Sequence, residues 1–250
     1  MVRACIDRVL PLELREDALR AAILENPANQ RGAGAPELAL ERAKKWKPGR
    51  TLRVRFLEGD PAVQGRVARA AMEWTRHANI HFRFVDDGEA EIRVTFRHDG
   101  SWSAVGTDAL VTRFFPRGEP TMNFGWLSPS SSDAEVAAVV LHEFGHALGC
   151  IHEHQSPAGG IAWNREQVYA DLGGPPNNWD RATIDFNMFG RYERSQTQFS
   201  EFDPDSIMLY AFPSSWTRSG GATRENASLS PTDMSFIAEA YPAGRAPRTP

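Results

Sequence analysis

Three histidines and a glutamate lie within one short segment at a spacing that suits metal-assisted hydrolysis. Residues 142–152 read His-Glu-Phe-Gly-His-Ala-Leu-Gly-Cys-Ile-His. On a helix, His142 and His146 point in directions only about 40° apart, so both imidazoles can bind one zinc ion. Glu143 lies beside them and can reach a metal-bound water without being a ligand itself. The spacing therefore predicts a zinc site on a helix.

The end of this segment predicts a third ligand. Gly149 permits a left-handed backbone and a sharp exit from the helix, which can bring His152 round to the metal. Three protein ligands leave one position open for water, as in catalytic rather than structural zinc sites. Five fixed positions at about one in twenty each make a chance match in this chain a matter of roughly one in ten thousand.

This chemistry predicts a zinc-dependent endopeptidase. Zinc would activate a water molecule and polarise the scissile carbonyl, and Glu143 would take the proton and pass it to the leaving amine. Two other functions stay open on the motif alone. One is a zinc-bearing binding protein without catalysis, and the other is a zinc hydrolase whose substrate is not a peptide.

A second motif lies downstream of the histidines. Residues 203–210 read Asp-Pro-Asp-Ser-Ile-Met-Leu-Tyr and resemble the Met-turn of metzincins, in which a methionine forms an apolar floor under the zinc site. Met208 matches that methionine.

Together these motifs resemble the astacin family of metzincins, and its bacterial and fungal members in particular. The resemblance runs from about residue 48 to 242. It is carried by Glu153 directly after the third histidine, by Tyr210 two residues after Met208, and by Ser-Trp-Ser-Ala-Val-Gly at 101–106, which is similar to the family's substrate-pairing edge strand. Ser156 stands where astacins commonly have an arginine.

The resemblance implies roles for two of these residues and a fold. Tyr210 would bind zinc at rest and donate to the oxyanion during the reaction, and Glu153 would contact the processed N-terminus of a mature enzyme. The implied fold is α+β, with a twisted mixed sheet of about five strands and the active-site helix in an upper lobe. The lower lobe would be mostly irregular and would end in a helix.

The two cysteines have different interpretations. Cys5 could supply a thiolate that fills the open zinc position and holds the enzyme latent, or it could be an inert thiol. Cys150 is interpreted as a buried core residue. The remaining histidines, His77, His81, His98 and His154, lack a ligand-like spacing.

Alternating apolar and charged residues predict the strands, and helical spacing and caps predict the helices. Strands are expected at 52–56, 81–85, 91–96 and 121–126. Helices are expected at 11–25, from Val63 to Trp74, from Ser132 to about Gly149, and from Ser230 to about Tyr241.

Glycines and prolines between Asn26 and Pro36 predict a linker. Residues 1–45 are therefore expected to form an N-terminal extension of the prosegment kind, followed by a catalytic domain at 46–250. Its upper lobe would span about 46–152 and its lower lobe about 153–250.

Composition limits the partners. The chain is 41% hydrophobic with a net charge of −4 and a pI of about 6.0. This acidic balance does not indicate binding to nucleic acid or to an anionic membrane surface. No signal peptide is evident, so we expect a cytoplasmic protein or export by a non-classical route. The expected partner is a peptide or protein substrate, and the expected state is a monomer.

Overall fold

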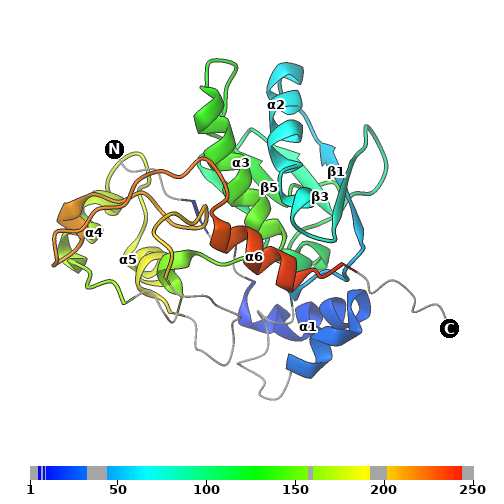
Figure 1. Cartoon of the computed structure of the whole chain (residues 1–250), viewed down its shortest axis with the longest axis horizontal. Helices are drawn as coiled ribbons and strands as arrows, with labels where there is room; N and C mark the ends of the chain where they lie inside the picture. Colours follow the sequence, from blue (N-terminus) through cyan, green and yellow to red (C-terminus); the bar gives the residue numbers. More distant parts are fainter. Residues whose placement is uncertain are drawn as a thin grey trace.

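The computed structural model describes residues 5, 6, 8, 10–32, 44–156, 160–191 and 202–243. Two lobes are visible in Figure 1: one holds the sheet with α2 and α3, and the other holds α4 and α5. Each lobe has its own cluster of buried apolar side chains, and α6 and the chain leading to it run between the lobes.

The sheet has five strands in the order β2-β1-β3-β5-β4. Its strands are listed here in chain order: β1 Thr51–Phe56, β2 His81–Phe84, β3 Ile92–Thr95, β4 Ser101–Ser103 and β5 Met122–Phe124. All neighbouring pairs are parallel except β4 and β5, which are antiparallel. The expected mixed five-stranded sheet is confirmed, with β4 as an edge strand.

Two helices pack against each other beside this sheet, α2 (Pro61–Ala71) and α3 (Asp133–Ala147). Asp60 caps α2 by accepting a hydrogen bond from the Ala62 amide, and Ser132 caps α3 by accepting one from the Glu135 amide. Most of α3 is buried, which explains its nearly continuous apolar composition.

The C-terminal end of α3 is held by side chains from distant parts of the chain. The Trp46 indole donates to the Ala147 carbonyl at 2.8 Å, and the Tyr241 hydroxyl donates to the Leu148 carbonyl at 2.6 Å. These bonds satisfy carbonyls that a helix end leaves without partners. Gly149 then takes the expected left-handed conformation, with φ of +92°.

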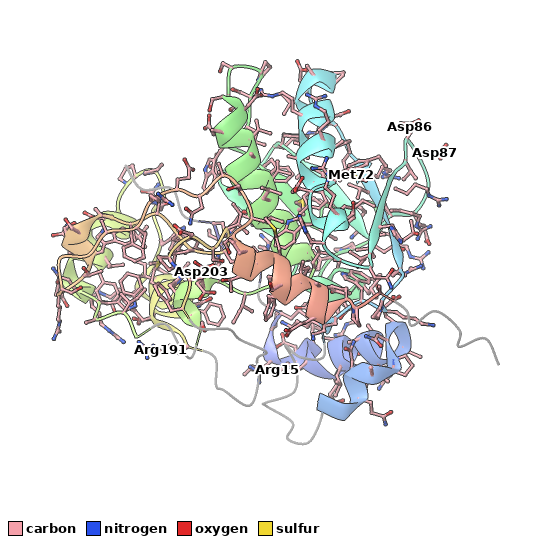
Figure 2. The ribbon with its side chains drawn as sticks, in the orientation of Figure 1. Arg15, Met72, Asp86, Asp87, Arg191 and Asp203 are labelled. Carbon is pink, nitrogen blue, oxygen red and sulfur yellow. The ribbon has the colours of Figure 1, made fainter. Side chains whose placement is uncertain are left out.

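The second lobe is irregular over much of its length and leads to α6 (Pro231–Ala240), as expected, but it also contains helices that the sequence did not predict. These are α4 (Arg165–Gly173), α5 (Arg181–Ile184) and a π-helical turn at Asp185–Phe189. Their short lengths and the glycines and prolines between them obscured the helical period. Arg191 and Asp203 belong to this side of the molecule, whereas Asp86 and Asp87 lie at the far end of the sheet lobe (Figure 2).

The N-terminal extension contains the expected helix. A 3₁₀ turn at Leu12–Leu14 continues into α1 (Arg15–Glu25), and a second 3₁₀ turn follows at Pro27–Gly32 within the predicted linker. Leu10, Leu14 and Ala18 form an apolar cluster with Val111 of the sheet lobe. The rest of the predicted linker lies outside the described residues.

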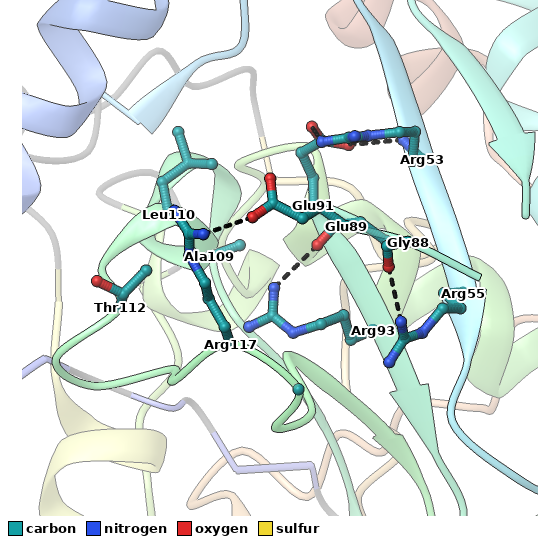
Figure 3. A pocket seen from close by; sticks show the side chains of 12 residues that line it. Arg53, Arg55, Gly88, Glu89, Glu91, Arg93, Ala109, Leu110, Thr112 and Arg117 are labelled. Atoms are coloured by element: carbon teal, nitrogen blue, oxygen red, sulfur yellow. Dashed lines mark hydrogen bonds and ion pairs between the residues drawn. The ribbon is translucent and has the colours of Figure 1, made fainter.

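A pocket of about 470 Å³ adjoins β1 and β3 and is lined by arginines whose guanidinium groups already have partners (Figure 3). Arg53 and Arg50 both donate to Glu91, and Arg93 donates to the carbonyls of Ala90 and Phe115. The arginines therefore serve to hold the loops around the sheet. Across the described residues, no helix is both long and apolar enough to cross a membrane.

Candidate metal centre

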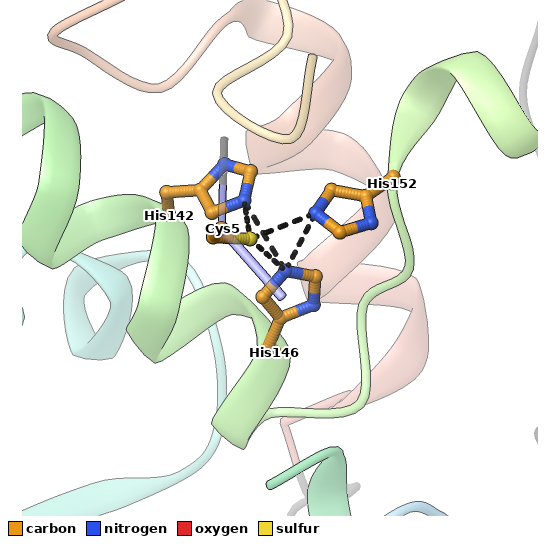
Figure 4. Close-up of side chains that lie close together, drawn as sticks. All are labelled: Cys5, His142, His146 and His152. Carbon is orange, nitrogen blue, oxygen red and sulfur yellow. Dashed lines mark hydrogen bonds between the residues drawn. The ribbon is translucent and has the colours of Figure 1, made fainter. Parts of the chain in front are cut away.

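The three predicted histidines converge on one point. His142 and His146 extend from α3, and His152 extends from the loop beyond Gly149. The Nε2 atom of His146 lies 3.2 Å from that of His142 and 3.1 Å from that of His152. Cys5 completes the group, with its Sγ atom 3.2, 3.6 and 3.0 Å from the Nε2 atoms of His142, His146 and His152 (Figure 4).

Backbone carbonyls fix the tautomers of two of these imidazoles. The Nδ1 atom of His142 donates to the Ile207 carbonyl at 2.8 Å, and that of His146 donates to the Cys150 carbonyl at 2.9 Å. A carbonyl can only accept a hydrogen bond, so each Nδ1 carries the proton and each neutral ring keeps a lone pair on Nε2. These lone pairs face the common centre.

The spacing of the four atoms fits tetrahedral zinc. Zinc binds histidine nitrogen at about 2.0–2.1 Å and cysteine sulfur at about 2.3 Å. A tetrahedron with these bond lengths separates two nitrogens by about 3.4 Å and a nitrogen from a sulfur by about 3.6 Å. The four donor atoms lie within 4.8 Å of one another, and their chemistry is that of the zinc-binding residue types.

The turn that holds Met208 is fixed by α6. Asp233 accepts hydrogen bonds from the Ser206 hydroxyl at 2.7 Å and the Ile207 amide at 2.8 Å, and it also completes the capping box of α6 with Ser230. Met208 is buried, and its sulfur faces the backbone of α3 at Gly145. The predicted Met-turn therefore lies against the helix that carries His142 and His146.

Glu143 and Tyr210 both adjoin the histidines. They line a small cavity of about 70 Å³ together with Cys5, His142 and Trp126. The Tyr210 hydroxyl donates to the backbone carbonyl of Cys5 at 2.6 Å, and its ring lies 4.3 Å from that of His152.

Glu153 and Cys150 line a second pocket, which Met208 also lines. Burial raises the pKa of Glu153 to about 7, and the nearby carboxylates of Asp233 and Asp203 act in the same direction. Glu153 also accepts a hydrogen bond from the Asp203 amide at 3.0 Å. Burial raises the pKa of the Cys150 thiol to about 12, and its place in the main apolar cluster confirms it as a core residue.

Two residues that follow His152 were not predicted to contact the site. Gln155 accepts from Nδ1 of His152 at 3.3 Å and donates to the Phe186 carbonyl at 2.8 Å, so it ties the third histidine to the second lobe. The His154 ring lies 4.6 Å from that of Tyr210. Their position directly after the motif was the only sequence signal that they could contact the site. Which of these side chains point towards the histidines depends on the path of the loop, which the sequence pattern does not show.

Comparisons with known proteins identify relatives of the chain. A family model described as Matrixin (Peptidase_M10) matches residues 52–159. A solved structure titled "Structure of myroilysin" is 46% identical, with a TM-score of 0.77, and the match covers 81% of this chain and 98% of that chain. A "Crystal structure of myroilysin" is also 46% identical, with a TM-score of 0.63 and coverage of 80% and 86%. No curated protein matches the chain.

A more distant structure shares the fold. High choriolytic enzyme 1, a hatching enzyme zinc-protease from the medaka fish Oryzias latipes, is 18% identical, with a TM-score of 0.52 and coverage of 80% of this chain and 94% of that chain. The motif, the fold and the similarity to myroilysin agree. The chain belongs to the metzincin zinc proteases and is a zinc-dependent endopeptidase.

Proposed function

We propose that His142, His146 and His152 are the zinc ligands of this endopeptidase and that Glu143 is its general base. The observation that carries the proposal is the convergence of Nε2 atoms whose rings are held through Nδ1. When bound, zinc lowers the pKa of a water molecule and polarises the substrate carbonyl. Glu143 is 1% exposed and lines the same cavity as His142, where it would accept the proton and deliver it to the leaving amine.

Tyr210 would stabilise the developing oxyanion. Its hydroxyl already donates to a peptide carbonyl beside the histidines, that of Cys5. A substrate carbonyl in the same place would receive the same hydrogen bond, which strengthens as negative charge builds on the oxygen. When neither Cys5 nor a substrate lies beside the histidines, the Tyr210 hydroxyl would approach the metal.

Within the metzincins, we assign the chain to an astacin-like type. The support is Glu153 directly after the third histidine and Tyr210 two residues after Met208. The matrixin match ends at residue 159, ahead of the Met-turn, so it does not bear on Tyr210.

The catalytic unit would be residues 46–250, acting as a monomer on extended peptide or protein substrates and not on nucleic acid. Support for an extended substrate comes from β4, whose outer edge can accept another strand. Residues 1–45 would be a regulatory extension of the prosegment kind.

Cys5 would hold the enzyme latent by binding the metal. Its sulfur lies 3.0–3.6 Å from all three Nε2 atoms, where it would occupy the position that a catalytic water needs. Zinc X-ray absorption of the full-length chain should then show one sulfur at about 2.3 Å beside nitrogen ligands, and the sulfur should be absent in Cys5→Ala. An all-nitrogen and oxygen shell in the unmodified chain would refute the thiolate contact.

The catalytic assignment is tested by Glu143→Gln in a Cys5→Ala chain. We expect one zinc per chain in both proteins, because Glu143 is not a ligand, and loss of at least about a thousandfold in the cleavage of unfolded casein. His152→Ala is the companion variant and should lose zinc as well as turnover. Substantial casein cleavage by the Glu143→Gln chain would show that another group is the base.

A further inference from the structure

The extension follows the substrate-binding edge of the sheet beyond Cys5. The Ile6 amide donates to the Ser101 carbonyl of β4 at 3.4 Å. Leu10 then packs in the cluster that contains Val111. The extension and the segment from β4 onward thus advance in the same direction, and the extension lies where an extended peptide would pair with the edge strand.

Arg8 occupies a defined place on this path. Its guanidinium carbon lies 4.6 Å from the centre of the Trp102 ring and 5.7 Å from that of Phe114. Both distances are within the roughly 6 Å over which a cation is attracted to an aromatic face. The Arg8 guanidinium therefore lies against two aromatic rings at once.

The two rings come from elements that remain when the extension leaves. Trp102 is the central residue of β4, and Phe114 lies beyond the 3₁₀ turn Gly106–Leu110. Trp102 is 6% exposed and belongs to the main apolar cluster, and Phe114 packs edge-on against Phe115 with ring centres 4.9 Å apart. Displacing the extension would free the sides of the two rings that Arg8 now contacts.

We propose that Trp102 and Phe114 form a substrate subsite that selects an arginine or lysine side chain. The proposal rests on the proposed function, because it assumes that substrates take the place of the extension. Arg8 is three residues from Cys5, which corresponds to about 10 Å of extended chain. The selected residue should therefore lie two to four residues from the scissile bond, on the side that runs along β4.

Matched peptides can separate charge from shape at this subsite. The enzyme is the full-length chain with Cys5→Ala and Arg8→Ala, which frees the metal and the aromatic pair together. The substrates are quenched fluorescent peptides in which arginine, citrulline or norleucine is placed at each position on both sides of the scissile bond. Citrulline has nearly the same shape as arginine but no charge.

We expect arginine to be preferred over citrulline at a single position, by about fivefold in kcat/KM, as two partly solvated cation–π contacts would give. Trp102→Leu and Phe114→Leu should each reduce this ratio to about twofold or less, and Trp102→Phe should retain part of it. Tyr169→Leu is the matched control, because Tyr169 lies on α4 in the second lobe and Arg181 lies 4.3 Å from the centre of its ring. That variant should keep the preference.

Equal cleavage of arginine and citrulline peptides at every position would overturn the subsite, as would a preference that both Trp102→Leu and Phe114→Leu leave intact. A binding experiment tests the subsite without turnover, so a failure of the subsite can be distinguished from a failure of the proposed function. Adding Glu143→Gln to the same chain allows fluorescence anisotropy with labelled peptides. If no peptide is cleaved by the active chain, tighter binding of arginine than citrulline peptides, lost in Trp102→Leu, still supports the subsite, and equal binding refutes it.

Discussion

At the scale of single residues, the proposed zinc site depends on the groups that contact Nδ1 of each histidine. His142 and His146 are oriented by carbonyls of the Met-turn and of the loop after α3, and His152 is oriented by Gln155. Such contacts fix ring orientation before the metal arrives, and losing one commonly costs 10- to 100-fold in metal affinity or activity. The local motif thus works because two other segments are folded against it.

Tyr210→Phe tests the role of the phenol hydroxyl. In a Cys5→Ala chain, we expect kcat to fall by about a hundredfold with little change in KM, because the hydrogen bond is made mainly in the transition state. Steady-state kinetics on a peptide substrate measure both constants. A rise in KM at unchanged kcat would mean that Tyr210 only helps to bind substrate.

At the scale of elements, α3 and the Met-turn pack so closely at Gly145 that a larger residue there would meet Met208. A β-carbon at Gly145 would overlap the sulfur of Met208 and come within 3.1 Å of Trp74. Any side chain at this position of the zinc motif would therefore have to displace Met208 or Trp74.

Gly145→Ala should lower the stability of the folded chain. Overpacking costs about 1–3 kcal/mol, and the close approach to both Met208 and Trp74 should place this cost above the roughly 1 kcal/mol that alanine gains in a helix. Gly65→Ala in α2 is the matched control, because its nearest neighbour is the flexible end of Arg69 at 3.6 Å. Thermal unfolding should show a lower Tm for Gly145→Ala and an equal or higher Tm for Gly65→Ala. A raised Tm in both variants would contradict the packing argument.

The ion pairs of Glu91 with Arg50 and Arg53 predict a contribution to the stability of the folded chain that is lost in acid. Burial of Glu91 disfavours its charge, but hydrogen bonds from the Arg53 side chain and backbone outweigh burial and lower its pKa. A lowered pKa in the folded state adds stability that is complete above the unfolded value of about 4.3 and is lost as the pH falls through the folded value.

Glu91→Gln should therefore lower Tm at pH 7. The difference in Tm between this variant and the unmodified chain should shrink as the pH falls below about 4.3. Glu89→Gln is the control, because Glu89 pairs with Arg117 in an exposed position where an ion pair contributes little. Melting curves between pH 3 and 7 provide the measurement. A gap that widens in acid would reverse the inferred sign.

The elements also show why prediction succeeded in some places and not in others. The strands at 51–56 and 81–84 and the helix with the zinc motif follow from residue periods within one segment, which sequence alone displays. The short helix α4 has only a weak helical period, and the glycines and prolines beside it indicate a loop instead. The contact of Gln155 with His152 depends on the path of a loop, and that of Arg8 with Trp102 joins segments far apart in the chain. No local pattern encodes either contact.

At the scale of the whole molecule, the described residues of the N-terminal extension contact both lobes and the three histidines. Its helix α1 packs on the segment that follows β4, and Asp17 forms an ion pair with Arg113 at 2.9 Å. Its first described residue, Cys5, belongs to the apolar cluster of the second lobe while its sulfur faces the histidines. In the proposed latent state, the docked helix would raise the effective concentration of the Cys5 thiol at a bound zinc.

The central claim is that this chain is a zinc endopeptidase closed by its own thiol. The most direct test compares casein cleavage by the zinc-loaded full-length chain, by Cys5→Ala and by Cys150→Ala, which removes a thiol that is buried in the core. We predict that Cys5→Ala raises the initial rate by at least about tenfold and that Cys150→Ala does not. A Cys5→Ala chain no more active than the unmodified protein would contradict closure by Cys5, and the absence of cleavage by every zinc-loaded chain would contradict the peptidase itself.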